Sequence, residues 1–169
     1  MATNFLQATG ASTAGYFSAV TTLISSELVA LGTSSGTAST ALSASTFTSS
    51  GSFGQAIWGE VELTLGTSSS AAFGSGAFVS GWFSRSIDGG TIFESTSNSS
   101  NAGFPRPPDF VIPLTSFAYN SSSVIYASGL VKMPWSPCKV FIQNNTGLTF
   151  PASTNGYALI KLGPVAVQY

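Results

Sequence analysis

Apolar and polar residues alternate along several short stretches of the chain, and the alternation is clearest in Gln55–Leu65. One row of this stretch is apolar apart from a glycine in the gap, and consists of Ile57, Gly59, Val61, Leu63 and Leu65. The opposite row consists of Trp58, Glu60, Glu62 and Thr64. A period of two residues predicts a half-buried antiparallel strand, and Gly59 is expected to mark a bulge.

Further short apolar runs, separated by turn-forming residues, predict more strands. In Ala77–Ser84 both faces carry apolar residues. The other expected strands are Ile24–Leu31, Thr91–Glu94, Phe110–Leu114, Val124–Leu130, Lys139–Gln143 and Tyr157–Leu162, with Leu148–Phe150 as a segment that pairs back. Tight turns are expected at Asp88–Gly90, where positive φ is needed, and at Asn144–Gly147. Irregular structure is expected from Gly32 to Ser45 and over Ser95–Pro108.

The segment from Tyr16 to Leu31 is compatible with two structures. A helix would place Tyr16, Val20, Leu23, Ile24 and Leu28 in one apolar stripe. Threonine and serine, which occupy much of the same segment, are poor helix formers. An extended segment that leads into the strand Ile24–Leu31 is therefore favoured.

Strands recur at short spacing and no convincing helix separates them, which predicts an all-β fold. The expected architecture is an antiparallel β-sandwich, with a barrel as the related alternative. A chain of 169 residues fits one domain of ordinary size. We expect a flexible N-terminal arm over residues 1–14, because this stretch is small and polar, and a single β-sandwich domain over residues 15–169.

The chain is poor in charge: only 7% of its residues are charged, against about 25% in an average soluble domain. Its five basic residues are scattered, so neither a nucleic-acid footprint nor a basic membrane-binding run is expected. A surface with little charge favours association. Two interpretations compete, a Ser/Thr-rich extracellular domain and a subunit whose surface is covered in an assembly; we favour the second.

Candidate chemistry is sparse. The chain has no histidine, which removes the commonest general base and the imidazole metal ligands. Glu60 and Glu62 are spaced for one face of a strand, as a glycosidase pair could be, but parallel projection favours a solvated face. Cys138 is alone and is expected to be an inert thiol. We therefore expect no catalytic, metal or cofactor residues, and no small-molecule substrate.

The N-terminus lacks a positive stretch followed by an apolar run, and no apolar run reaches the length of a membrane span. Cytoplasmic synthesis without secretion or membrane insertion is therefore expected. The single cysteine agrees with this expectation, because it allows no internal disulfide framework.

Three segments together resemble a group of small structural proteins of tailed bacteriophages. They are Trp58–Leu65, Ser86–Glu94 and Lys139–Gly147. The group shows a D-V-E-L strand, an S-x-D-G-x-x-Y-E turn and a late K-V-x-x-x-N-x-T-G hairpin, and the likeness extends from Leu28 to Leu162. This chain departs from the pattern at Gly59, at Phe93 and in the long segment before Pro108.

The resemblance implies a jelly-roll cement or decoration protein on the outside of a phage capsid. Its partners would be the major capsid protein and further copies of itself, as a homodimer or homotrimer. Exposed aromatics and the proline-rich loop make the interface candidates Trp58, Glu60, Glu62, Phe104, Pro105, Arg106, Pro107 and Trp135. The alternative is a tail, baseplate or fibre module of the virion that binds carbohydrate through its tryptophans. A glycan-active enzyme that uses Glu60 and Glu62 is the third and least favoured hypothesis.

Overall fold

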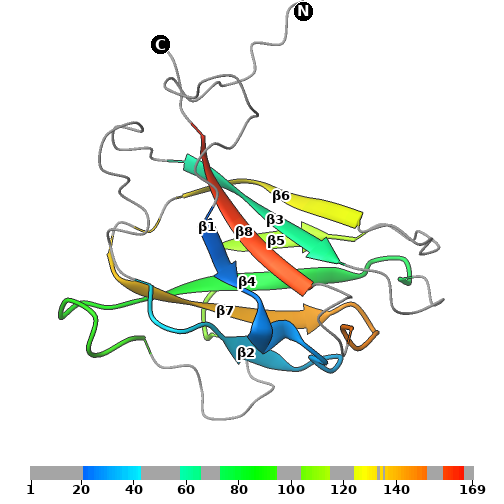
Figure 1. Cartoon of the computed structure of the whole chain (residues 1–169), viewed down its shortest axis with the longest axis horizontal. Helices are drawn as coiled ribbons and strands as arrows, with labels where there is room; N and C mark the ends of the chain where they lie inside the picture. Colours follow the sequence, from blue (N-terminus) through cyan, green and yellow to red (C-terminus); the bar gives the residue numbers. More distant parts are fainter. Residues whose placement is uncertain are drawn as a thin grey trace, which may run out of the picture.

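The computed structural model describes residues 21–42, 58–65, 73–94, 104–114, 124–132, 134, 136–151 and 158–165 (Figure 1). The expected N-terminal arm, residues 1–14, and the interface candidate Trp135 lie outside these ranges. The described residues form strands and one short 3-10 helix, η1 (Ser26–Leu28). The prediction of an all-β fold is confirmed.

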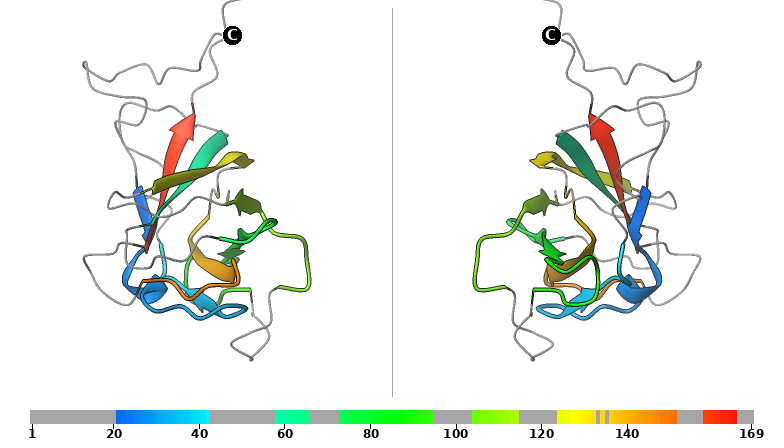
Figure 2. Two further views of the ribbon diagram at one scale, coloured as in Figure 1. Left: turned by 90° about the vertical axis from the view of Figure 1, so that its right-hand side faces the viewer. Right: turned by 90° about the vertical axis from the view of Figure 1, so that its left-hand side faces the viewer.

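Within the described ranges, eight strands form two antiparallel sheets of four strands each. The first sheet, sheet A, has the order β1 (Thr21–Ile24), β8 (Ala158–Val165), β3 (Trp58–Leu65) and β6 (Val124–Lys132). The second, sheet B, has the order β2 (Gly36–Ala38), β7 (Cys138–Asn145), β4 (Phe78–Arg85) and β5 (Phe110–Pro113). The two sheets form two layers when the molecule is seen end-on (Figure 2).

The strands pair in a nested way along the chain. The first strand pairs with the eighth, the second with the seventh, the third with the sixth and the fourth with the fifth. Two further pairings, β3 with β8 and β4 with β7, join these pairs into the two sheets. The chain therefore follows the path of one long hairpin with two paired arms. Successive strand pairs of this hairpin lie alternately in sheet A and in sheet B.

One cluster of buried apolar side chains lies between the layers and draws on both sheets. In β3 the burial alternates as the period of two predicts, with Val61, Leu63 and Leu65 inside. In β4 both faces are largely buried, in agreement with its apolar residues on both sides. Gly81 of β4 is needed for this packing, because a Cβ there would lie 1.9 Å from the Phe110 ring.

The N-terminal part of the fold differs from the prediction. The expected strand Ile24–Leu31 is wrong: β1 ends at Ile24, and η1 follows with Leu28 fully buried. The expected loop from Gly32 to Ser45 contains β2, which pairs with β7. Gly36 of β2 lies under an aromatic ring, since a Cβ there would come within 2.3 Å of Phe141. These short elements have no local apolar pattern, and contacts with distant parts of the chain determine where they lie.

A bulge was expected at Gly59 of β3, and this expectation is wrong, because the bulge lies in the neighbouring strand, β6. The register between β3 and β6 shifts between Glu60 and Glu62, where β6 carries one extra residue. Gly129, in the bulged part of β6, has a φ of +78°, a conformation that favours glycine. The Val61 N–H donates to the Ser128 hydroxyl, in the bulged part of β6, at 3.2 Å.

Two expected short strands are not formed as such. Thr91–Glu94 contributes only an isolated bridge between Ser86 and Phe93. Leu148–Phe150 is not a strand, and the Phe150 N–H donates to the Leu31 carbonyl at 3.0 Å. The turn at Asp88–Gly90 is confirmed, with positive φ at both of its glycines.

Candidate functional site

The outer face of sheet A carries the first group of expected interface residues. Trp58 of β3 is 40% exposed and pairs with Lys132 of β6, while Glu60 pairs with Leu130, which is 60% exposed. Glu62 follows on the same face and is partly exposed. The structure thus brings Trp58, Glu60 and Glu62 together, as the alternation predicted, and adds Leu130, which the sequence did not single out. We call these four residues with Lys132 the tryptophan face.

The electrostatics of this face follow from two neighbouring carboxylates on one strand. Partial burial raises the pKa of Glu60 above its usual value, and the charge of Glu62 raises that pKa further. Both side chains project from the same face of β3. Sugar hydrolysis by two carboxylates needs them on either side of the scissile bond, and parallel projection does not provide that arrangement.

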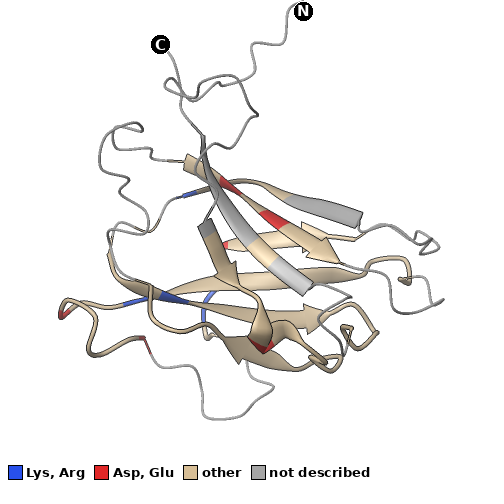
Figure 3. Cartoon of the chain, in the orientation of Figure 1, with Lys and Arg blue, Asp and Glu red and all other residues tan. Residues whose placement is uncertain are grey.

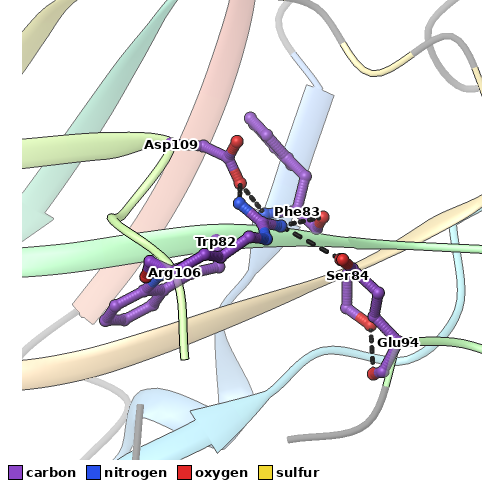
Figure 4. Close-up of polar contacts among 6 residues, drawn as sticks. All are labelled: Trp82, Phe83, Ser84, Glu94, Arg106 and Asp109. Carbon is purple, nitrogen blue, oxygen red and sulfur yellow. Dashed lines mark hydrogen bonds and ion pairs between the residues drawn. The ribbon is translucent and has the colours of Figure 1, made fainter. Parts of the chain in front are cut away.

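The second group of expected interface residues lies in the segment that precedes β5, and its Arg106 is bound within the chain (Figure 4). The Arg106 guanidinium donates to the Asp109 carboxylate at 2.8 Å, to the Phe83 carbonyl at 2.9 Å and to the Glu94 carboxylate at 3.1 Å. The same Asp109 oxygen accepts the Phe83 N–H at 2.7 Å. We call these contacts the Arg106 clamp.

The Arg106 clamp continues the edge of sheet B with side chains. The last backbone pair between β4 and β5 joins Gly81 to Phe110, and Phe83 lies two residues beyond it. At that point Asp109 accepts the Phe83 N–H and Arg106 donates to the Phe83 carbonyl. A longer β5 would otherwise have paired with both groups. Burial alone would lower the pKa of Arg106, but Asp109 and Glu94 raise it, so the guanidinium stays charged.

An aromatic cluster covers the outer face of sheet B beside the clamp. It consists of Trp82, Phe104 and Phe141, with ring centroids 5.7 to 6.0 Å apart. The Trp82 indole N–H donates to the Arg106 carbonyl at 3.0 Å, and the Arg106 guanidinium lies 5.4 Å from the Phe104 ring centroid. Phe104 is therefore only 8% exposed, and Pro105 and Pro107 are the exposed members of the segment. Contact of this segment with a partner stays a prediction.

Sequence reasoning missed the most exposed apolar residues of the described chain, which lie after β4. Ile87 is 98% exposed and Ile92 is 66% exposed. They flank the Asp88–Gly90 turn, so the signal was present as two isoleucines beside turn-forming residues. The turn was recognised, but its apolar neighbours were assigned to strands or left unexamined.

Outside the tryptophan face and the Arg106 clamp, the described groups that could carry chemistry lie apart or are buried. Burial raises the pKa of the Cys138 thiol to about 12, with Arg85 opposing this rise and Asp109 adding to it. Acidic and basic residues are few and spread over both layers (Figure 3). Within the described ranges, no three His, Cys, Asp or Glu side chains gather as a set of metal ligands. Nor does the described part of the chain contain a helix long and apolar enough to cross a membrane.

Comparisons with known protein families, curated proteins and solved structures find no significant match. The resemblance to phage decoration proteins therefore rests on the motifs of the sequence, and the function has to be argued from the described geometry.

Proposed function

We propose that this chain is a structural protein of a tailed-phage virion that binds the outside of the capsid and stabilises it by bridging major capsid subunits. The observation that carries the proposal is the nested pairing of the eight strands into two sheets. A hairpin that is nested in this way and divided between two sheets is the path of a jelly-roll β-sandwich. Jelly rolls are typical of viral capsid domains and of lectins.

The surface supports a role in assembly. The tryptophan face places a large aromatic and an exposed leucine side by side on the outside of a sheet, where a partner can reach both. Aromatic residues are enriched where protein interfaces form. With only 7% charged residues in the whole chain, little charge opposes close approach of other subunits.

A cement role also agrees with the energetics of a lattice. A specific contact between proteins buries about 1,200–2,000 Å² in total. When each copy contacts more than one subunit of a shell, the contacts reinforce each other through effective concentration. Small copies that associate as homodimers or homotrimers at the junctions of the shell would therefore resist internal pressure without strong individual contacts.

The copy number of the protein in purified virions tests the proposal directly. We expect a ratio to the major capsid protein that is near to, or simply related to, one, together with loss of shell stability when the protein is removed. A ratio of a few per cent would contradict the cement role and assign the protein to the tail or to a vertex.

A paired substitution tests the tryptophan face. Leu130→Ser removes an apolar side chain that is 60% exposed on sheet A, and Val111→Ser removes one that is 39% exposed on sheet B. We expect the first variant to bind shells more weakly than the second, with unchanged circular dichroism in both. Equal binding by both variants would show that this face does not contact the shell.

The second candidate is a tail, baseplate or fibre module that binds carbohydrate. The observation in its favour is Trp58 on the outer face of sheet A beside the carboxylates of Glu60 and Glu62, since an aromatic ring stacks on sugars and carboxylates accept hydroxyl hydrogen bonds. Tryptophan fluorescence that changes with surface glycans of the host, and is insensitive to them in Trp58→Ala, would support this candidate.

A further inference from the structure

Residues 86–93, which we call the isoleucine loop, directly follow β4 and fold back on themselves as two short arms. The bridge between Ser86 and Phe93 closes the loop. Ile87 and Ile92 occupy the next position outward on each arm, and they are 98% and 66% exposed. The loop extends from the left-hand end of sheet B in Figure 1, away from both layers.

One carboxylate oxygen holds the loop in shape. Asp88 Oδ1 accepts hydrogen bonds from the Ser86 hydroxyl at 2.7 Å, the Ile92 N–H at 2.8 Å and the Thr91 N–H at 3.0 Å. The Ser86 hydroxyl accepts the Gly90 N–H at 2.8 Å. The backbone on both sides of the exposed isoleucines is therefore hydrogen-bonded within the loop itself.

The base of the loop is attached to neighbouring strands. The Ser86 N–H donates to the Pro137 carbonyl at 2.9 Å, and the Glu94 N–H donates to the Arg85 carbonyl at 3.1 Å. The Lys139 ammonium of β7 lies 4.8 Å from the centroid of the Phe93 ring. The loop thus presents two exposed apolar side chains on a hydrogen-bonded backbone. Less conformational entropy is then lost when the loop binds a partner.

The size of the apolar tip indicates what kind of contact it can make. Two isoleucines that become buried remove roughly 100 Å² of apolar surface each. That area is far below the roughly 1,200 Å² of even a small specific interface, so the loop cannot by itself hold two free copies together as a stable dimer. It fits an anchor that enters a pocket and adds to other contacts on a repeated surface.

The charge of the loop favours a protein pocket over a lipid surface. Asp88 is the single charged residue between Ser86 and Phe93, and it lies exposed to solvent. The nearby basic side chains, Arg85 and Lys139, lie at the base of the loop and not at its tip. The tip therefore lacks the cluster of basic residues by which a segment binds anionic headgroups. A protein pocket can instead receive the isoleucines and place N–H or basic groups at its rim, opposite the carboxylate.

We propose that the isoleucine loop anchors this protein to the shell by inserting Ile87 and Ile92 into an apolar pocket of the capsid subunit. The pocket has N–H or basic groups at the rim, which face Asp88. The inference rests on the proposed function, because the shell supplies the pocket. It adds a second contact, separate from the tryptophan face and on the other sheet.

The test uses the full-length protein and shells of the major capsid protein produced without it. We compare the wild type, the double variant Ile87→Ser/Ile92→Ser and the control Val111→Ser, whose side chain is also exposed. Loss of two apolar anchors should weaken binding by roughly 100-fold or more, while the control stays within about threefold. Circular dichroism and thermal unfolding establish that all three proteins fold alike.

A second pair of variants tests the order of the loop while both isoleucines are kept. Asp88→Ala removes the acceptor of three hydrogen bonds, whereas Asp88→Asn retains an oxygen that can accept them. We expect Asp88→Ala to bind roughly tenfold more weakly than Asp88→Asn, because the loop must then be ordered on binding.

The outcomes separate the two proposals. If the wild type binds shells and the isoleucine double variant binds equally well, the anchor is refuted and the cement role stands. If the wild type does not bind shells, the cement role fails and this anchor with it. Binding of the wild type to phosphatidylcholine–phosphatidylglycerol vesicles that is lost in the double variant, with shell binding unchanged, would assign the loop to a lipid surface and overturn the anchor.

Discussion

The two loops attached to β4 make a contrast. The segment before β5, residues 104–109, is rich in proline and holds an arginine, and its sequence suggested a free arm for a partner. In the structure its arginine and aspartate are bound to β4, and Phe104 is buried. The isoleucine loop, in contrast, was expected to be a tight turn at Asp88–Gly90 followed by a short strand, and it exposes two large apolar side chains.

The polarity of a loop therefore does not reveal whether the loop is available to a partner. Arg106 and Asp109 are charged, but they form an ion pair with each other and hydrogen bonds with the Phe83 backbone groups that β5 does not reach. Asp88 is also charged, but it satisfies only its own loop and leaves the isoleucines outside. Polar groups that bind each other within the molecule, as in the Arg106 clamp, are not available to a partner. Polar groups that order a loop, as Asp88 does, can leave its apolar side chains exposed to a partner.

The largest effect is expected at Asp109, where one carboxylate oxygen serves both Phe83 and Arg106. Asp109→Ala leaves the Phe83 N–H without this acceptor and Arg106 without its 2.8 Å partner. We expect the free energy of unfolding to fall by about 2–4 kcal/mol. Urea unfolding measures the loss, and Asp109→Asn should lose less because its amide oxygen can still accept. Equal stability of Asp109→Ala and the wild type would contradict the clamp.

A smaller loss is expected at Arg106, whose side chain is 31% exposed. Arg106→Ala removes three donated hydrogen bonds and should lower the free energy of unfolding by about 1–3 kcal/mol, since solvent screens part of the network. Arg106→Lys keeps the charge but not the planar fork and should recover only part of the stability. Full recovery by lysine would show that charge alone, without this geometry, stabilises the segment.

The isoleucine loop should behave in the opposite way. Ile87→Ser and Ile92→Ser change side chains that make few contacts with the rest of the chain, as their 98% and 66% exposure indicates. We expect each substitution to change the free energy of unfolding by less than about 0.5 kcal/mol. A loss comparable with that of Arg106→Ala would show that the isoleucines pack within the protein, and it would remove the contrast between the loops.

The smallest effect is a local response to pH in the isoleucine loop. The pKa of Asp88 lies below its usual value, first because its carboxylate accepts the Ile92 N–H and then because it accepts the Ser86 hydroxyl. A depressed pKa in the folded state means that the carboxylate orders the loop above the usual aspartate range. That order is lost only as the pH falls through the lower, folded-state pKa.

Amide NMR shifts of Thr91 and Ile92 measure this response. They should stay constant down to the usual aspartate range and change below it, and Asp88→Asn should abolish the change. A midpoint at or above the usual aspartate pKa would contradict the hydrogen-bonded loop.

The strands with a clear local pattern could be predicted from the sequence. The alternation in Gln55–Leu65 predicted β3 with its buried and exposed rows, and the apolar positions on both sides of Ala77–Ser84 predicted a strand that is buried on both faces. The same alternation placed Trp58, Glu60 and Glu62 on one face. These features depend on a period of two residues along one strand, which is a local property.

Other features depend on contacts between distant parts of the chain. β2 has no apolar alternation, and it exists because β7 pairs with it and because Gly36 leaves room for Phe141. The bulge occurs in β6 and not at Gly59, since register belongs to a pair of strands and not to one of them. The Arg106 clamp joins residues that lie up to 26 positions apart in the sequence.

The all-β class, the main strands and the turn at Asp88–Gly90 could therefore be predicted locally, because alternation and positive φ act over a few neighbouring residues. The nested pairing of the strands, and the choice of which loop at β4 faces solvent, became visible only in the folded molecule. Both depend on which distant backbone and side-chain groups satisfy each other's hydrogen bonds and cover each other's apolar surface, and no local pattern contains that information.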